Sequence, residues 1–370
     1  MSERVTRPPV NRPTVAMIEL SGRGGICHYT ACLIGALRDL AEVRLYTGEP
    51  YELQGSLQDV QVRPVFRSYR TNPWRVLQAL VDIRRMKPDV VHIQMSQALG
   101  FVAVLVAMLR LLALKVVVTA HNVLPHERSR MSLLALRFIY GRSAALIVHS
   151  RHCRGQLLAE FGARVADKAT IIDHGDYMML AGATVSHAAP SGTFTVLFFG
   201  FIRQYKGLDV LIRAVGAMRA SGRDCRLLVV GRPVEPFAPY QALMRELGIE
   251  AVTECVLDYV PIEAIGVYFN RSSCVVLPYI DASQSGVLQL AYAFGKPVVA
   301  SRVGGLPEAV IEGGSGLLVA AGDPAGLAAA LTRLLDDPAL CRRLSEGAEE
   351  LAKTRFAWTS IARLTLSAYA

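Results

Sequence analysis

The sequence predicts an α/β protein made of two doubly wound domains, each built on a parallel sheet. Three observations lead to this fold class. Short apolar segments alternate with segments of helical periodicity along almost the whole chain, a pattern typical of βαβ units. The alternation stops once, at the small and turn-rich residues 181–193, and then begins again. The length of 370 residues allows two domains of ordinary size, each with its own core.

The elements of the first half follow in the order that a doubly wound sheet requires. We expect strands at 14–20, 43–46, 90–94, 113–120 and 145–148, and helices near 29–40, 77–86 and 132–140. The most apolar segment, residues 98–114, is interrupted by Arg110 and is shorter than the about 20 residues that span a bilayer. It therefore predicts a buried helix that leads into the strand following it.

The second half repeats this organisation. We expect strands at 195–199, 226–230, 255–257, 274–277 and 297–300, and helices near 208–220, 239–247, 262–270, 286–294, 324–335 and 338–352. Two domains follow, residues 1–185 and 186–355, with the segment 181–193 as the linker. Ligands of such sheets bind beyond the carboxyl ends of the strands, so we expect the functional site in a cleft between the domains.

The net charge of +9 lies entirely in the first half. Residues 1–185 hold 23 Lys and Arg against 14 Asp and Glu, and the remaining residues hold 17 of each. Such a basic surface favours a phosphate ligand, an anionic lipid surface or nucleic acid, unless the chain is simply rich in arginine. Seven scattered cysteines without a C-x-x-C pair predict a reduced, cytoplasmic protein without a zinc knuckle. Residues 1–13 lack the apolar core of a signal peptide.

The most informative motif begins where the strand 195–199 ends. Gly200 closes the apolar run, and Arg203 and Lys206 follow in a loop. A second group of small residues opens the helix 286–294; it consists of Ser283, Gln284, Ser285, Gly286 and Val287. Cationic side chains on one side and helix-start N–H groups on the other suit a diphosphate, whose negative charge as a leaving group fixed cations would stabilise. We infer an enzyme that takes a sugar from a nucleotide diphosphate; solvated cations and a serine that only caps the helix are the simpler alternatives.

Further candidates follow the strands of the first half. Gly24 and Gly25 lie in a loop between a strand and a helix, but Cys27 occupies the third glycine position of a dinucleotide-binding fingerprint. The loop therefore predicts a close approach to a ligand, or a tight turn without one, rather than a nicotinamide site. Candidates for contacts with a sugar or an acceptor are His121, His126, Glu127, His149 and His174, with ordinary buried histidines as the alternative. The spacing of His121 and His126 does not match the helical zinc motif, so we predict no metal ligands.

Together, these motifs resemble the retaining glycosyltransferases of family 4, whose GT-B fold consists of two Rossmann-like domains facing each other across a cleft. The resemblance covers nearly the whole chain. It rests on Gly24-Gly25-Ile26, His121-Asn122, Val148-His149-Ser150, His174-Gly175, Gly200 with Arg203-Gln204-Tyr205-Lys206-Gly207, residues 293–299 and Gly304-Gly305-Leu306-Pro307-Glu308. Residues 356–370 are similar to the carboxy-terminal helix that crosses back to the first domain in this fold.

The resemblance implies a role for most of these residues. His121 would contact the donor sugar, Arg203 and Lys206 would bind the diphosphate, and these three are the expected catalytic residues. Gly24, Gly25, Gly200, Glu308 and residues 283–287 would complete the donor site. The departing phosphate would itself take the proton of the acceptor, so transfer with retention needs neither a side-chain nucleophile nor a cofactor. The absence of a D-x-D sequence agrees with the metal-independent chemistry of this fold.

The chain departs from the family pattern inside the donor site. The two glutamates expected eight positions apart are replaced by Ala282 and Leu290, with Asp281 and Gln289 adjacent to them. Phe201 occupies the position of the usual arginine after the strand glycine, so we expect Arg203 to substitute for it.

The resemblance and the charge distribution together lead to a functional expectation. We expect a hexosyltransferase that uses a nucleotide-sugar donor and a glycan or lipid-linked acceptor in surface polysaccharide biosynthesis. Its basic half would contact the anionic inner face of the membrane from the cytoplasm, and we expect no nucleic-acid partner. A non-transferring nucleotide-sugar enzyme of the same fold, such as an epimerase, and a non-catalytic binding relative are the alternatives.

Overall fold

The protein is described by a computed structural model in which residues 12–53, 55, 57, 59–67, 72–125, 129–177 and 192–370 are placed. The chain divides into two compact units. The first comprises Met1–Val148, Arg154–Ile172 and Ile361–Ala370, and the second comprises His149–Cys153 and Asp173–Ser360. The final residues of the chain therefore belong to the first unit, and a short segment after Val148 belongs to the second. Most of the expected linker lies outside the described residues.

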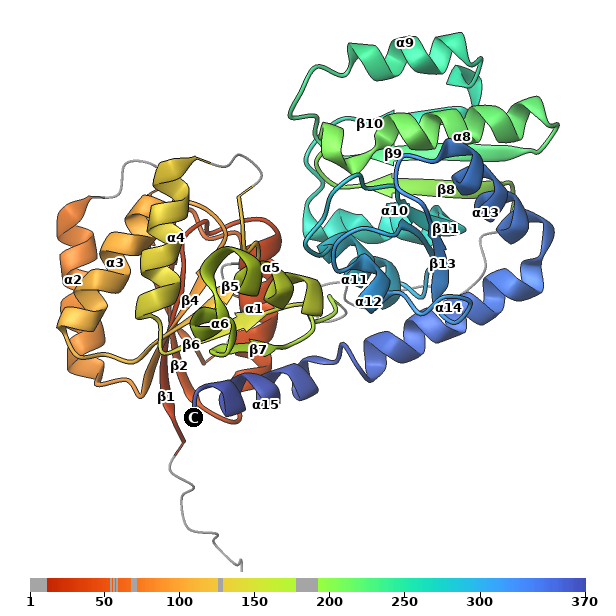
Figure 1. Ribbon diagram of the computed structural model, residues 1–370. Coiled ribbons are helices and arrows are strands. Elements are labelled where there is room, and N and C mark those ends of the chain that lie inside the picture. Colours follow the sequence, from red (N-terminus) through yellow and green to blue (C-terminus); the bar gives the residue numbers. More distant parts are fainter. Residues whose placement is uncertain are drawn as a thin grey trace, which may run out of the picture. The chain divides into compact units, whose positions relative to one another are not determined.

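The first unit is built on a seven-stranded sheet in which every strand pairing is parallel. The order of the strands is β3-β2-β1-β4-β5-β6-β7 (Figure 1). Their bounds are β1 Thr14–Glu19, β2 Glu42–Gly48, β3 Gln61–Phe66, β4 Val90–Met95, β5 Val116–Ala120, β6 Ala145–Val148 and β7 Ala169–Ile171. The order changes direction between β1 and β4, which is the switch point at which a doubly wound sheet opens a crevice for ligands.

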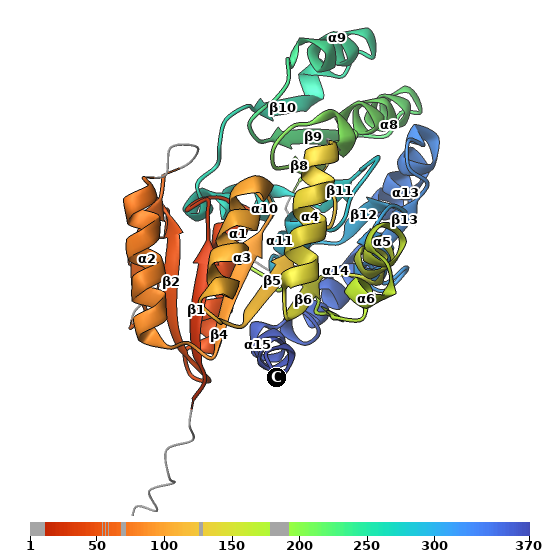
Figure 2. The same ribbon diagram turned by 60° about the vertical axis from the view of Figure 1, so that its left-hand side comes forward.

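Helices connect these strands, and Figures 1 and 2 show them on both sides of the sheet. Their bounds are α1 Gly25–Leu37, α2 Pro73–Met86, α3 Leu99–Leu111, α4 Arg130–Arg142, α5 Arg151–Phe161, α6 Ala163–Ala166 and α15 Trp358–Ala368. Asn72 caps α2 through its side chain, and Pro73 occupies the first helical position, where its missing N–H costs nothing. Ser129 and Ser132 form a reciprocal capping box at the start of α4.

The second unit repeats the architecture with a six-stranded, wholly parallel sheet of order β10-β9-β8-β11-β12-β13. The strands are β8 Phe194–Phe199, β9 Cys225–Val230, β10 Thr253–Val256, β11 Cys274–Leu277, β12 Val298–Ser301 and β13 Gly316–Val319. The helices are α8 Leu208–Ala220, α9 Ala238–Glu246, α10 Ile265–Arg271, α11 Gly286–Ala293, α12 Leu306–Ala309, α13 Pro324–Asp336 and α14 Pro338–Lys353. The switch point lies between β8 and β11, so the segments after these two strands border the crevice of this sheet.

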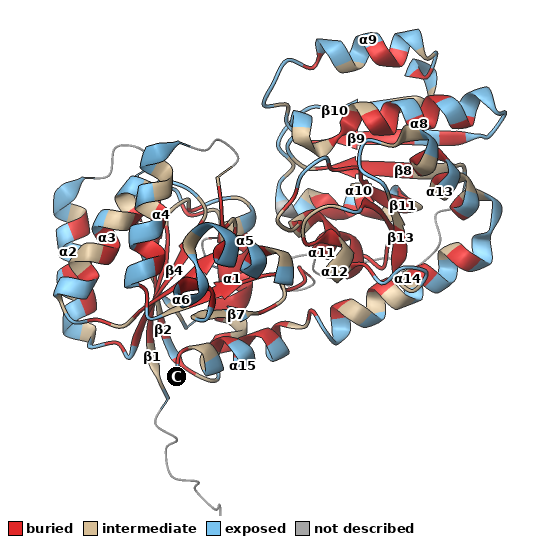
Figure 3. Ribbon diagram, viewed as in Figure 1, coloured by how far each residue is buried: buried red, intermediate tan, exposed pale blue. Residues whose placement is uncertain are grey.

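The hydrophobic core of each unit consists of the sheet and the inward faces of its helices. In Figure 3 the central strands are buried along nearly their whole length, whereas the helices alternate between buried and exposed residues. Strands of a parallel sheet are covered on both faces, which explains why they appear in the sequence as continuous apolar segments. Polar residues are buried where the strands end, and these positions form the candidate site described below.

The expected α/β class, the parallel sheets and most of the elements are confirmed. Some edge strands were not anticipated, because they are short or polar. β3 contains the exposed residues Arg63 and Pro64, and a proline is tolerated only at a sheet edge. The expectation of a buried helix at 98–114 is wrong in one respect. α3 forms, but it buries a single face and leaves Val104 and Leu111 exposed, because a helix covering a sheet has an outer side.

Candidate active site

The loop after β8 folds back so that the ammonium group of Lys206 lies over the end of its own strand. A Cβ atom at Gly200 would come within 3.1 Å of Lys206 Nζ and 3.4 Å of a methyl group of Val287. Gly207 has a φ of 67°, and a Cβ atom there would lie 2.0 Å from the carbonyl oxygen of Pro278. Both positions require glycine, because the loop packs directly against the segment that precedes α11.

The surroundings of Lys206 are only partly exposed to solvent. Its Nζ atom lies 5.5 Å from the ring centroid of Tyr279, a distance typical of a cation–π contact. Burial lowers the pKa of Lys206, and the positive charge of Arg203 acts in the same direction. Arg203 itself is exposed. A lysine whose charge is poorly solvated is well suited to gain from an anionic ligand.

The start of α11 lies beside this lysine. Ser285 occupies the N-cap position, but its side chain makes no capping hydrogen bond. Its hydroxyl group instead lies 3.1 Å from the hydroxyl group of Tyr279. The simple expectation that a serine caps this helix is therefore wrong for Ser285, and its side chain does not satisfy the first N–H groups of α11.

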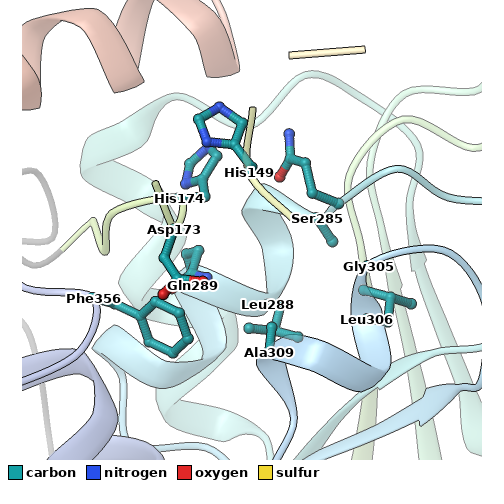
Figure 4. A pocket seen from close by; sticks show the side chains of 11 residues that line it. His149, Asp173, His174, Ser285, Leu288, Gln289, Gly305, Leu306, Ala309 and Phe356 are labelled. Carbon is teal, nitrogen blue, oxygen red and sulfur yellow. The ribbon is translucent and has the colours of Figure 1, made fainter. Parts of the chain in front are cut away.

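A pocket lined in part by residues at the start of α11 lies entirely within the second unit (Figure 4). Its lining residues are His149, Asp173, His174, Gln284, Ser285, Leu288, Gln289, Gly305, Leu306, Ala309 and Phe356. Gln289 is buried, and its side-chain oxygen has no hydrogen-bond partner among the described residues; the same holds for the oxygen of Gln284. Buried amide oxygens are nearly always paired in folded proteins, so two of them beside one pocket indicate a site for a hydrogen-bond donor.

Two of the predicted histidines meet in this pocket. The rings of His149 and His174 lie 5.3 Å apart between centroids. Figure 4 shows the two rings next to each other. His174 Nδ1 lies 2.8 Å from the carbonyl oxygen of Gly175, which can only accept, so the Nδ1–H group donates this hydrogen bond. Burial, reinforced by His149, lowers the pKa of His174 to about 3. The ring is neutral at physiological pH, so it can accept but does not contribute a positive charge.

Glu308 was expected among the donor-binding residues. Its carboxylate accepts hydrogen bonds from two backbone amides. One oxygen accepts from the N–H of Arg151 at 2.7 Å, and the other accepts from the N–H of His152 at 2.8 Å. These are the first residues of α5, where free N–H groups favour a negative charge. The carbonyl group of Glu308 accepts in turn from Arg355. Both carboxylate oxygens thus join segments of the second unit that are more than 150 residues apart in sequence.

In the first unit, His121 lies just beyond the carboxyl end of β5 and is 3% exposed. Its Nε2 atom lies 2.9 Å from the side-chain oxygen of Gln94, a residue of the adjacent strand β4. The edge of its ring meets the ring of Tyr29 in α1, with 4.7 Å between centroids. The imidazole is therefore held on two sides beyond the carboxyl end of β5, the neighbour of β4 at the switch point of this sheet.

The glycine loop after β1 is organised by two carboxylates. Glu19 accepts from the backbone N–H groups of Ser21 and Gly22, at 2.7 and 2.8 Å. The N–H of Gly24, which precedes the first residue of α1 at Gly25, donates to Glu52 at 2.8 Å. The loop amides are thus partly occupied by the protein's own carboxylates.

The structure brings together a large part of the residues expected from sequence. Within the second unit, Lys206, Gly200 and Val287 are neighbours, and His149, His174, Gln284 and Ser285 line one pocket. His126 and Glu127 lie outside the described residues. Sequence reasoning missed the roles of Glu19, Glu52, Gln94 and Tyr279. Glu19 could have been found, because a carboxylate directly before a glycine loop has free amides within reach.

Family comparisons agree with this geometry in both units. Residues 24–173 match the model of the glycosyl transferase 4-like domain, and residues 193–337 match that of glycosyl transferases group 1. The chain belongs to the family 4 glycosyltransferases. The two matches include Gly24, His121 and the Lys206 loop, whereas Glu19, His174 and Phe356 lie outside them.

Relatives and solved structures extend this result. The D-inositol 3-phosphate glycosyltransferase of Corynebacterium glutamicum is 39% identical over 185 residues, which are 49% of this chain and 44% of the relative. That of Pseudarthrobacter chlorophenolicus is 34% identical over 188 residues, 50% of this chain and 44% of the relative. The alignments thus span less than half the length of these relatives.

Among solved structures, Anabaena HepE in complex with UDP-glucose matches with a TM-score of 0.78 at 19% identity, over 96% of this chain and 100% of HepE. Sucrose-phosphate synthase from Thermosynechococcus elongatus matches with a TM-score of 0.74 at 20% identity, over 97% and 98% of the two chains. At such identities the likeness establishes the fold, which is GT-B.

None of the helices in the described part of the chain has the length and apolarity to cross a bilayer. Within the same residues, no group of three or more His, Cys, Asp and Glu side chains is arranged to hold a metal ion. The prediction of metal-independent chemistry stays a prediction.

Proposed function

We propose that this family 4 glycosyltransferase moves a hexose, with retention of configuration, from a nucleoside diphosphate sugar to a glycan or lipid-linked acceptor. The observation that carries the proposal is the position of Lys206 Nζ beside Gly200 and Val287, at the start of α11. A cation and a helix N-terminus then converge on one point, which is the arrangement that a diphosphate requires. The solved complexes of HepE with UDP and UDP-glucose support a uridine nucleotide as the first donor to test.

The reaction breaks the bond between the anomeric carbon and the diphosphate oxygen. The acceptor oxygen forms its bond to the same face of that carbon, and its proton passes to the departing phosphate. Lys206 and the α11 amides stabilise the charge that grows on the leaving group, and Arg203 supplies a second cation from solvent. This route needs no side-chain nucleophile, metal ion or other cofactor. His121 is proposed to contact the donor sugar.

The pocket beside α11 is proposed to hold the polar, uncharged part of the donor. The family glutamates are absent at Ala282 and Leu290, both of which are buried. Gln289 and Gln284 supply amide groups in the pocket instead, and Gln289 is 3% exposed with an unpartnered oxygen. An amide can accept from a ribose or sugar hydroxyl group as a carboxylate can, without introducing a negative charge close to the diphosphate.

The test begins with thermal-shift measurements with UDP, GDP and ADP and with their sugar nucleotides. Lys206→Ala should lose turnover by roughly 10²–10³-fold, because it removes a cation that acts on the leaving group. Lys353→Ala is the matched control, since Lys353 is an exposed lysine of the same unit that pairs with Glu349. Near-normal transfer by the Lys206 variant would contradict the proposal.

The alternatives give different outcomes in the same assays. An epimerase-like enzyme would convert the donor into another sugar nucleotide without an acceptor, whereas a transferase would leave that sugar unchanged or hydrolyse it slowly. A non-catalytic relative would give no product at all. If no nucleotide raised the melting temperature, both the transferase and the epimerase-like hypotheses would be rejected.

We further propose that α4 contacts an anionic membrane surface on the cytoplasmic side, where a lipid-linked acceptor for polysaccharide synthesis would lie. Met131, Leu134 and Phe138 are exposed and are spaced by three and four residues, so they share one face of the helix. Arginines at 130, 137 and 142 flank them, and α4 contains no acidic residue. An apolar stripe bordered by arginines is typical of helices that lie in a lipid interface.

A further inference from the structure

A chain of buried polar side chains crosses one face of the sheet in the first unit. It comprises His121, Gln94, His92, Thr119 and Tyr369, none of which is more than 7% exposed. Gln94 pairs in register with Thr119, and Met17 pairs with His92, so these four side chains share a face of neighbouring strands. Burying so many polar groups in an apolar core is unfavourable unless each one is paired, and here each one is.

The contacts run from the candidate active site to the carboxy-terminal helix. His121 Nε2 lies 2.9 Å from Gln94 Oε1, and Gln94 Nε2 lies 3.4 Å from His92 Nε2. His92 Nε2 is also 2.7 Å from Thr119 Oγ1, and its Nδ1 is 2.7 Å from the hydroxyl group of Tyr369, the residue that directly follows α15. Lys115 fixes the end of α15 by donating to the carbonyl oxygen of Tyr369 at 2.5 Å.

Hydrogen-bond directions along this chain follow from what each atom can do. The Gln94 amide nitrogen faces Met17 Sδ at 3.3 Å as well as His92 Nε2, and a thioether can only accept. The amide oxygen must then face His121, and only an N–H at His121 Nε2 satisfies it. Because His92 Nε2 accepts from Gln94, the proton of a neutral His92 ring sits on Nδ1 and is donated to Tyr369. Burial lowers the pKa of His92 to about 3, so this ring is indeed neutral at pH 7.

We propose that Gln94 is a positioning residue that holds His121 as its Nε2–H tautomer in one ring orientation, and that Tyr369 and His92 set the direction of the Gln94 amide. The functional part of this inference rests on the proposed contact between His121 and the donor sugar. Helix α15 thereby contributes to the state of a residue at the opposite end of the sheet strands. The contact with Tyr29 restricts the same ring from α1.

The direct test is the tautomer of His121, measured by two-bond ¹H–¹⁵N correlation on histidine-labelled protein, with His121→Gln used to assign the signal. The wild type should show the Nε2–H form. Gln94→Met, which matches the shape but accepts no hydrogen bond, should leave a mixture of tautomers. Gln94→Glu retains the acceptor and should restore the Nε2–H signal. Ser143→Ala is the control, because it removes a buried hydroxyl group of the same unit that donates to Ile139, outside this chain of polar side chains, and it should leave His121 unchanged.

Kinetics supply the second readout. Gln94→Met should lower kcat by about tenfold or more through misorientation of His121, with little change in KM, and Gln94→Glu should recover much of that loss. Tyr369→Phe should shift the His92 signals. It should also lower the population of the Nε2–H tautomer of His121, as Gln94→Met does. An Nδ1–H tautomer in the wild type, or an unaltered spectrum and kcat in Gln94→Met, would overturn the inference. Failure of the wild type to use any sugar nucleotide would instead reject the proposed function, since the tautomer is measured without substrate.

Discussion

The indole ring of Trp358 occupies the space in which a side chain at position 175 would lie. A Cβ atom on Gly175 would come within 2.4 Å of an indole carbon, and the indole N–H donates to the carbonyl oxygen of Asp176 at 2.6 Å. The neighbouring amide of Asp176 donates to the carbonyl oxygen of Phe356 at 3.0 Å. Segments 173–177 and 355–358, distant in sequence, are thus joined within the second unit by a ring that admits only glycine opposite it.

Gly175→Ala should therefore lower the free energy of unfolding of the second unit by about 2–4 kcal/mol, because the indole ring must move and its hydrogen bond weakens. Denaturant unfolding followed by tryptophan fluorescence measures the change. Gly155→Ala is the control: it lies on a helix with open space around its Cβ position, and should be neutral or slightly stabilising. Equal stabilities for the two variants would show that the packing argument is mistaken.

Glu308→Gln tests whether this residue serves the fold or the donor. The carboxylate accepts from the amides of Arg151 and His152, and a neutral amide retains one acceptor but loses the charge at a helix start. We expect a loss of about 1 kcal/mol of stability, with nucleotide affinity little changed. Thermal melting and nucleotide titration are measured on the same variant. A large loss of affinity at unchanged stability would assign Glu308 to the donor site instead.

Gln289→Leu should change stability and binding in opposite directions. Removing a buried amide whose oxygen has no partner should raise the stability of the unliganded protein by about 1 kcal/mol. The same change should weaken binding of the nucleotide or its sugar, because the pocket loses an acceptor. Melting curves with and without ligand give both quantities. Leu288→Met, a shape-conserving change in the same pocket, is the control variant. If the two variants bound the ligand with the same affinity, Gln289 would not contribute to ligand binding.

Acid should destabilise the second unit through His174. The pKa is lowered to about 3 in the folded protein from 6.5, so below pH 6.5 the unfolded chain binds more protons and stability rises with pH between these values. At pH 5 the loss relative to pH 7 is about 2 kcal/mol. Trp74→Phe leaves Trp358 as the sole tryptophan and hence a reporter on this unit. His174→Gln in that background should flatten the pH dependence; an unchanged slope would exclude His174 as its cause.

Removal of the apolar stripe on α4 should reduce membrane binding. Leu134→Gln combined with Phe138→Gln removes two exposed apolar side chains, so the fold should persist while affinity for vesicles falls by tenfold or more, on the order of 1.4 kcal/mol or above. Cosedimentation with phosphatidylglycerol vesicles measures the effect, and phosphatidylcholine vesicles test the charge. Val267→Gln, at an exposed apolar position of α10 in the second unit, is the control. If vesicle affinity changed neither with lipid charge nor with the α4 substitutions, α4 would not be the membrane-binding surface.

Sequence patterns predicted the elements well where the signal is local. Parallel strands such as β4 and β11 are buried on both faces and appear as unbroken apolar segments. The loop from Gly200 to Lys206 could be predicted as a phosphate-binding loop for a similar reason. Its signal is local, because a glycine and two cations directly follow an apolar strand. Where a strand is short or half exposed, as β3 is at Arg63 and Pro64, the local signal disappears.

The chain's own residue order determined the two α/β units, the glycine positions and the cations of the donor loop, because these depend on neighbours within a few residues. Only the tertiary structure decided which side chains meet. His121 forms a hydrogen bond with Gln94, and Glu308 accepts hydrogen bonds from the amides of Arg151 and His152. Trp358 packs against Gly175. Each of these contacts joins residues that are far apart in the sequence, so the hydrophobic periodicity of the chain contains no information about it. The distance and orientation of the paired groups depend only on how the elements pack against each other.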